Sequence, residues 1–184
     1  AVLCPHGHYA VGRYDKDVQA RCVGLARRGY VTLAIDAVGY NDREAQGHRR
    51  TWFLFAAGQT VEGIQTWDNM RAIDYLQSRG DIDPKRIGCA GNSGGGTQTS
   101  YFMALDERIL CAAPSCYLTS MRRLTDTIGP QDAEQNIHGQ IARGMDHADY
   151  IIMRAPKPTL ICCATRDFFD IQGTWDSFRQ AKRV

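Results

Sequence analysis

The sequence predicts an α/β fold with a mostly parallel sheet and helices on both faces. Short apolar runs alternate along the chain with amphipathic segments, which is the pattern of strands joined by helices. A glycine-rich turn, Gly91-Asn92-Ser93-Gly94-Gly95, joins one of these runs directly to a helical segment. The 184 residues, 43% of them apolar and 23% charged, are enough for one domain with its own core.

Five apolar runs have the length and composition of buried parallel strands. They cover residues 1–4, 30–35, 86–90, 109–113 and 159–164. The second run ends at Asp36, and Asp83-Pro84 breaks the chain before the third because proline fixes φ and lacks an N–H donor. Since the first strand begins at residue 1 without a lead-in, we expect the sequence to be a fragment that is incomplete at both ends.

Amphipathic segments between these runs predict four main helices. They cover residues 15–29, 61–79, 94–105 and 174–183. Asp15 or Asp17 can cap the first helix, and Gly29 suits its C-terminal turn. In the second helix apolar residues recur every three positions, so they spread around its circumference, as in a helix that packs on a sheet.

Composition argues against several classes of partner. The 22 Lys and Arg residues nearly balance the 20 Asp and Glu residues, so we expect no nucleic-acid or membrane-surface binding. No apolar stretch is long enough for a membrane span, and the chain does not open on a signal-peptide pattern.

The seven cysteines contain no C-x-x-C pair and do not indicate structural zinc. Cys4, Cys89, Cys111, Cys162 and Cys163 lie in the apolar runs, and we expect them to be reduced thiols in the core. This cysteine usage favours a cytoplasmic location unless an export signal lies upstream.

The turn around Ser93 matches the G-x-S-x-G pattern of a serine nucleophile held between a strand and a helix. In that setting a strained turn raises the hydroxyl above the sheet edge, and the glycines let two backbones approach closely. The following helix begins with N–H groups where an oxyanion would form. The alternative is an ordinary glycine-rich turn in which Ser93 is incidental.

Phosphate binding is the competing function for a glycine-rich turn between strand and helix. Residues 91–96 do not fit G-x-G-x-x-G because Ser93 occupies the position of its second glycine. They do not fit the P-loop pattern either, because Thr97 stands where that pattern requires lysine. We therefore expect no nucleotide cofactor.

Together these residues resemble the α/β-hydrolase superfamily over nearly the whole chain, and its acetyl xylan esterase and dienelactone hydrolase branches in particular. The resemblance rests on Pro5-His6-Gly7-His8 after the first strand, Asp36 after the second, the turn around Ser93, and Ala164-Thr165-Arg166-Asp167 after the last. Dienelactone hydrolases proper carry cysteine as the nucleophile, so the serine favours the esterases.

The resemblance implies a role for residues at two of these positions. Ser93 would be the nucleophile. The oxyanion hole would be formed by the backbone N–H groups of Gly94 and of either His8 or Tyr9.

The resemblance also implies a Ser–Asp–His triad, with Asp167 as the acid that orients the histidine and Asp170 as the fallback acid. All five histidines precede Asp167, so the expected C-terminal histidine is missing. We expect it beyond Val184 and expect little turnover from these 184 residues. His147 is the one substitute among the histidines present, although a loop or lid position near the cleft is the simpler expectation for it.

Two further regions bear on the substrate. Residues 119–150 are polar and irregular, with one or two short helices, and occupy the place of a cap-like insertion in a single domain spanning 1–184. We expect substrate selectivity to depend on them. Trp52, Phe53 and Phe55 could line an acyl or sugar pocket, but aromatic residues at this spacing are more often part of the core.

The sequence therefore predicts a serine esterase for a small or carbohydrate-linked carboxylic ester, with no cofactor. His6 and His8 are two residues apart, as metal ligands can be, but without a third candidate or a nearby carboxylate we expect no metal.

Two alternative functions remain. One is a serine peptidase of the prolyl oligopeptidase type, which would need a large extra domain. The other is a non-catalytic α/β-hydrolase-like binding module.

Overall fold

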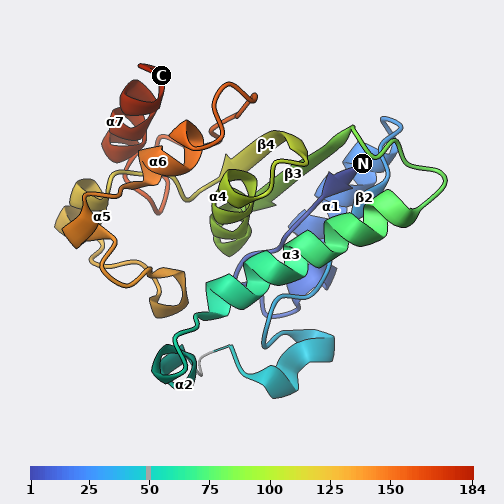
Figure 1. Cartoon of the computed structure of the whole chain (residues 1–184), viewed down its shortest axis with the longest axis horizontal. Helices are drawn as coiled ribbons and strands as arrows, with labels where there is room; N and C mark the ends of the chain where they lie inside the picture. Colours follow the sequence, from blue (N-terminus) through green and yellow to red (C-terminus); the bar gives the residue numbers. More distant parts are fainter. Residues whose placement is uncertain (49–50) are drawn as a thin grey trace.

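A computed structural model describes residues 1–48 and 51–184 and shows an α/β fold (Figure 1). Its sheet has four strands in the order β2-β1-β3-β4, all of them parallel to their neighbours. The strands are β1 (Val2–Leu3), β2 (Thr32–Leu33), β3 (Ile87–Asn92) and β4 (Ile109–Ser115). The predicted fold class is confirmed.

Because the strands are parallel, the segments that follow them all begin at one edge of the sheet. Val2 pairs with Thr32 on one side and with Gly88 on the other, and β3 pairs with β4 up to Asn92 and Ser115. The His-Gly segment after β1 and the turn after β3 therefore lie together at this edge, where α/β folds bind their ligands.

Seven helices are present among the described residues, and several begin at side-chain caps. They are α1 (Lys16–Ala26), α2 (Thr51–Ala56), α3 (Val61–Ser78), α4 (Gly94–Leu105), α5 (Met121–Thr127), α6 (His147–Ile152) and α7 (Ile171–Ala181). Asp15 caps α1, as one of the two predicted alternatives, by accepting the N–H of Asp17. Asp170 caps α7, which begins three residues before the predicted start at residue 174.

The helices pack around one hydrophobic core. Figure 1 shows α3 and α4 side by side over the sheet, and α5, α6 and α7 grouped at one end of the molecule. α4 contacts β3, β4 and α6, so it connects the sheet to this group. The largest buried core side chains come from the strands, from helices α3 to α6 and from the segment between β4 and α5: Leu3, Ile73, Leu76, Ile87, Phe102, Ile109, Tyr117, Leu124 and Tyr150. Among the described residues, no helix combines the length and hydropathy needed to cross a membrane.

The fifth predicted strand, 159–164, is an incomplete partner of β4. It runs parallel to β4 but makes only two isolated bridges, from Ala112 to Thr159 and from Ser115 to Cys162. Between them lies Pro114, whose carbonyl accepts the N–H of Cys162 at 3.0 Å but which has no N–H of its own. The missing donor interrupts the ladder at its centre, so a continuous strand does not form.

The prediction that the strand cysteines are core thiols is correct for two of the five. Cys4 and Cys89 are buried, Cys162 is half-buried, and Cys111 and Cys163 are exposed. Cys111 borders an open apolar hollow of about 340 Å³ on the sheet, where its side chain remains accessible.

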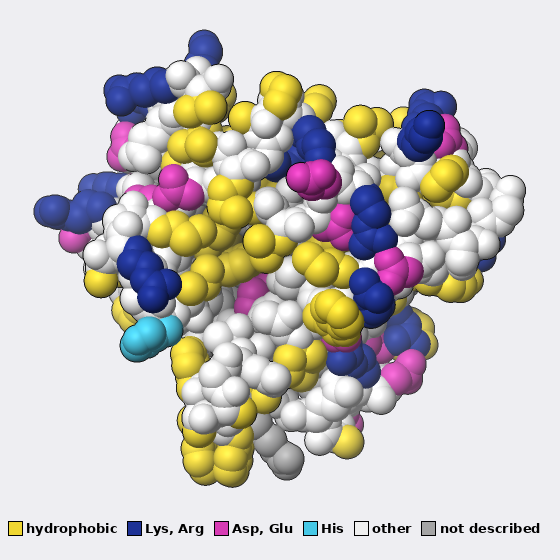
Figure 2. Space-filling view, viewed as in Figure 1, with side chains coloured by type: hydrophobic (Ala, Val, Ile, Leu, Met, Phe, Trp, Pro, Cys, Tyr) yellow, Lys and Arg dark blue, Asp and Glu magenta, His cyan; other side chains and the backbone are white. Residues whose placement is uncertain are grey.

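The aromatic residues of α2 are not part of the core, which corrects that expectation. Trp52, Phe53 and Phe55 are 65%, 56% and 40% exposed. Figure 2 shows hydrophobic side chains gathered at the corner of the molecule that α2 occupies in Figure 1. Phe53 and the half-buried Leu54 line an apolar pocket that does not include Ser93.

Candidate active site

Ser93 occupies a strained turn between β3 and α4. Its backbone has φ 58° and ψ −126°, which is unfavourable for a residue with a side chain and costs on the order of 1–3 kcal/mol. The Ser93 N–H donates to the carbonyl of Ser115 at 2.9 Å, and the Ser93 carbonyl accepts the N–H of Thr97 at 3.0 Å. β4 and the first turn of α4 therefore hold the turn in place.

The glycines around Ser93 are required by close backbone contacts. A Cβ at Gly95 would collide with the carbonyl of Pro5, and one at Gly96 would collide with the carbonyl of Ser115. α4 can begin this close to the sheet only without side chains at these positions.

The segment after β1 lies directly against the Ser93 turn. Tyr9, one of the two predicted oxyanion donors, already donates its N–H to the Gly7 carbonyl at 2.8 Å. The Tyr9 hydroxyl accepts a hydrogen bond from the Asn92 side chain at 2.8 Å, which ties this segment to the turn. In the part of the chain that the structure describes, the N–H groups of His8 and Gly94 donate to no other group, so this pair remains the candidate oxyanion hole.

Ser93 lines an open cleft of about 380 Å³. Its walls come from the segment after β1, the turn before α4, the 119–150 region and the segment before α7. The lining residues are His8, His48, Ser93, Gly94, Asp132, Glu134, Gln135, Phe168 and Phe169. The predicted cap-like region thus contributes three polar residues to the cleft.

Asp167 lies next to the cleft, because the following Phe168 and Phe169 line it. One carboxylate oxygen accepts the Cys116 thiol at 2.7 Å and the Phe169 N–H at 3.2 Å, and the other accepts the Ala164 N–H at 3.2 Å. Burial, reinforced by the Asp167 carboxylate, raises the pKa of Cys116 to about 12, so the thiol stays protonated and donates. These bonds fix the orientation of the carboxylate.

Asp170, the fallback acid, has a structural position instead. Its carboxylate accepts the N–H of Gly173 at 2.9 Å as the N-cap of α7, and it pairs with the Arg123 guanidinium at 2.8 Å. The ion pair with Arg123 holds the pKa of Asp170 below its ordinary value. Asp170 does not line the Ser93 cleft.

His147 is the first residue of α6 rather than a loop residue, and it does not line the cleft, although its ring lies against Tyr117, which contacts Phe169 of the cleft wall. It is fully buried, with Nδ1 accepting the Thr119 N–H at 3.3 Å and Nε2 3.1 Å from the Gln131 side-chain oxygen. Burial lowers the pKa of His147 to about 4, so the ring is neutral and donates through Nε2. Both ring nitrogens are therefore engaged in the interior, and among the described residues no hydrogen bond joins His147 to Ser93.

His6 is also buried, and both of its ring nitrogens are engaged. Nδ1 lies 2.7 Å from the Gly7 carbonyl, to which it can only donate, and Nε2 accepts the Ala37 N–H at 2.9 Å. The possible metal pair formed by His6 and His8 is therefore absent. His8 instead meets two other residues.

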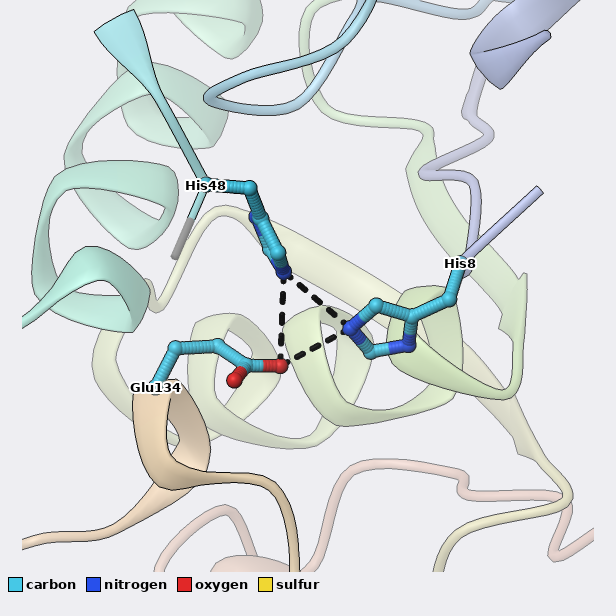
Figure 3. A group of neighbouring side chains, drawn as sticks. All are labelled: His8, His48 and Glu134. Carbon is cyan, nitrogen blue, oxygen red and sulfur yellow. Dashed lines mark hydrogen bonds and ion pairs between the residues drawn. The ribbon is translucent and has the colours of Figure 1, made fainter. Parts of the chain in front are cut away.

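His48 and Glu134, which were not predicted from the sequence, meet His8 (Figure 3). All three residues line the cleft of Ser93. His8 Nε2 lies 2.8 Å from Glu134 Oε1, and this hydrogen bond raises the pKa of His8. Burial alone would raise the pKa of Glu134, but the nearby imidazoles of His48 and His8 lower it to about 2. His8 lies 40 residues from His48 and 126 from Glu134, so no local spacing marks the cluster.

Comparison with known proteins identifies the family. Residues 16–176 match the prolyl oligopeptidase family, which the family description also names as peptidase S9. The chain belongs to this family. This membership agrees with the predicted α/β-hydrolase relationship. It is also the family of the serine peptidases that remained as one alternative in the sequence analysis.

Individual relatives include esterases and hydrolases. YtaP of Bacillus subtilis (strain 168), a hydrolase by name, is 29% identical over 188 residues, which cover 91% of this chain and 60% of that protein. The acetyl esterase Axe7A of Xylanibacter ruminicola is 29% identical over 139 residues, covering 68% of this chain and 31% of its own. The solved methylesterase BT1017 is 32% identical with a TM-score of 0.69, over 87% of this chain and 34% of that one. The chain thus spans from about a third to 60% of these relatives.

Proposed function

We propose that the protein is a serine esterase in which Ser93 is the nucleophile and Asp167 the acid of the triad. The observation that carries the proposal is the backbone of Ser93, strained at φ 58° between β3 and α4 and open to the cleft. Such strain persists only where the surrounding structure enforces it, and it is concentrated at functional sites. The unpaired N–H groups of Gly94 and His8 beside Ser93 are the proposed oxyanion hole.

In the proposed reaction the Ser93 oxygen forms a bond to the ester carbonyl carbon while its proton passes to an imidazole. The carbonyl oxygen becomes an oxyanion and accepts hydrogen bonds from the Gly94 and His8 N–H groups. Its collapse breaks the bond to the alcohol oxygen, which takes the proton and leaves. Water then releases the acid from Ser93 by the same steps.

None of the five histidines is placed as this imidazole. His6 and His147 are buried, with both ring nitrogens engaged. His8 and His48 line the cleft with Ser93, but among the described residues neither ring is hydrogen-bonded to Ser93 or Asp167, and the same holds for the exposed His138. The proposal therefore takes its general base from outside residues 1–184, in keeping with the sequence analysis. Asp167, fixed by three hydrogen bonds, is the residue that would orient it.

For the substrate we propose a carbohydrate-linked ester. Asp132 and Gln135 offer polar groups for sugar hydroxyls, and Phe168, 68% exposed, offers an aromatic ring for a sugar face. The names of the relatives support ester cleavage, since they describe an acetyl esterase and a methylesterase. Peptide hydrolysis is the alternative that the family name raises.

The test is a comparison of substrates with the protein at its natural length. We expect hydrolysis of p-nitrophenyl acetate and of acetylated xylo-oligosaccharides, little cleavage of a peptide p-nitroanilide, and loss of esterase activity in Ser93→Ala. Faster cleavage of the anilide than of the esters would favour the peptidase. Esterase activity that survives Ser93→Ala would overturn the proposal.

A further inference from the structure

Three side chains from distant parts of the chain converge on one point beside the cleft (Figure 3). His8 Nε2 lies 2.8 Å from Glu134 Oε1 and 3.1 Å from His48 Nε2, and His48 Nε2 lies 3.4 Å from Glu134 Oε1. His8 follows β1, His48 follows the 3-10 helix of residues 41–46, and Glu134 belongs to the 119–150 region.

When both imidazole rings are neutral, too few protons are available for hydrogen bonds between all three of these converging atoms. His48 Nδ1 lies 2.9 Å from the Val38 carbonyl, which can only accept, so Nδ1 carries the ring proton and Nε2 presents a lone pair. A carboxylate at Glu134 can only accept hydrogen bonds. His8 Nε2 supplies at most one proton to the three converging atoms, which leaves lone pairs directed at one another. A cation at the centre would satisfy all three.

The distances match those between the ligands of a tetrahedral metal. Metal–nitrogen and metal–oxygen bonds of about 2.0–2.1 Å place neighbouring ligand atoms about 3.3 Å apart. Two of the three separations, 3.1 and 3.4 Å, lie close to this value, and the third, 2.8 Å, is shorter.

A group behind His48 orients it as second-shell groups orient metal ligands, and a carboxylate lies behind His8. The hydrogen bond from His48 Nδ1 to Val38 directs Nε2 toward the cluster, and Asp132 Oδ2 lies 3.8 Å from His8 Nδ1. Gly39 has φ 82°, and a Cβ on it would collide with the backbone of His48. The path of the chain at His48 is thus set by close packing.

A second observation independently indicates a ligand here. A small cavity of about 10 Å³, the space of one water-sized occupant, borders all three side chains and is also lined by Glu62 and Gln65. Glu62 is 4% exposed and Gln65 is 3% exposed, and neither Glu62 Oε1 nor Gln65 Nε2 has a partner among the described residues. Buried polar atoms without partners are rare, and these two line the same cavity as the cluster.

We propose that His8, His48 and Glu134 bind a divalent transition metal ion of the Zn²⁺ class. Two imidazoles and one carboxylate form a ligand set that suits Zn²⁺ in a tetrahedral site with one open position. All three ligands also line the Ser93 cleft, so the open position is available to water or a substrate oxygen there. The ion would join the segment after β1 to the 119–150 region. This site does not depend on the proposed esterase activity.

The test uses Co²⁺ and Zn²⁺ as probes on protein first treated with a chelator. We expect one Co²⁺ per chain with the visible absorption bands of four-coordinate cobalt, displaced by Zn²⁺ in calorimetric titration. His48→Ala and Glu134→Gln should weaken binding roughly 100-fold or more, while His138→Ala, at an exposed histidine outside the cluster, should bind as the wild type does.

Three results would overturn the proposal: no saturable binding, a Co²⁺ spectrum without four-coordinate bands, or equal affinity in His48→Ala and the wild type. Circular dichroism checks that the variants fold. Should they not fold, the spectrum and stoichiometry of the wild-type protein still decide the question. Activity is not needed as a readout.

Discussion

Gly7 lies so close to Ser93 that a Cβ placed on Gly7 would be 2.9 Å from the Cβ of Ser93. The same added atom would be 2.7 Å from the Asn92 carbonyl oxygen and 3.1 Å from the Gly94 nitrogen. The segment after β1 and the turn after β3 therefore fix each other's position, although they are far apart in the sequence. In the proposed mechanism this contact sets the distance between nucleophile and oxyanion hole.

We expect Gly7→Ala to destabilise the protein and to lower its esterase activity. The added methyl group would overpack the contact with Ser93 and push the segment after β1 away from the Ser93 turn. We expect this to lower the free energy of unfolding by about 1–3 kcal/mol. Gly80→Ala is the matched control, because Gly80 is exposed and a Cβ there meets nothing within 4 Å. Urea unfolding measures both variants, and equal stabilities would show that the close contact is relaxed in solution.

The strain at Ser93 predicts that glycine is tolerated there better than alanine. Ser93→Gly relieves a φ of 58°, whereas Ser93→Ala keeps a Cβ in the same conformation, so we expect the glycine variant to be more stable by about 1 kcal/mol or more. Both variants should lack esterase activity. Thermal unfolding compares them, and a less stable glycine variant would contradict the strained geometry.

Substitutions of Asp167 and Asp170 should have different effects, the first on activity and the second on stability. Asp167→Asn is expected to lower kcat by roughly 10³- to 10⁴-fold because an amide would no longer hold the triad histidine in the required tautomer. Asp170→Ala removes the N-cap of α7 and the ion pair with Arg123, so it should cost about 1–2 kcal/mol of stability with kcat nearly unchanged. The reverse pattern would make Asp170 the acid.

Buried His147 predicts acid sensitivity of the fold. Its pKa is about 4 in the folded chain, against an ordinary value of 6.5, so the unfolded state binds the proton more tightly. Its contribution to stability is therefore present above pH 6.5 and is lost as the pH falls toward 4, by up to about 3 kcal/mol. Unfolding free energies of His147→Gln should vary less over this range than those of the wild type, whereas exposed His138→Gln should follow the wild type. An equal slope in His147→Gln would contradict the assignment.

The order of strands and helices could be predicted because each element carries its own local pattern. The apolar runs and caps predicted the places of β1 to β4, α1, α3 and α4, although β1 and β2 are shorter than the predicted runs 1–4 and 30–35. Residues 159–164 were predicted to form a continuous strand but make only isolated bridges to β4. A continuous ladder would need a backbone N–H at position 114 of β4, and Pro114 has none. The aromatic residues of α2 carry no local signal that distinguishes an exposed helix from the core.

The candidate site was predictable only where chemistry is encoded in a short motif. The conformation of Ser93 and the closeness of the His-Gly segment follow from glycines adjacent in the sequence. The choice between His8 and Tyr9 depended on which N–H was already engaged, and the meeting of His48 with Glu134 depends on the path of two long loops. Such contacts exist only in the folded chain.

The most direct measurement is to identify the residue that a fluorophosphonate probe labels in the protein at its natural length. We expect one covalent adduct per chain, located by peptide mass spectrometry on Ser93 and absent from Ser93→Ala. An adduct on a different serine, or no adduct on a folded protein that hydrolyses p-nitrophenyl acetate, would contradict it.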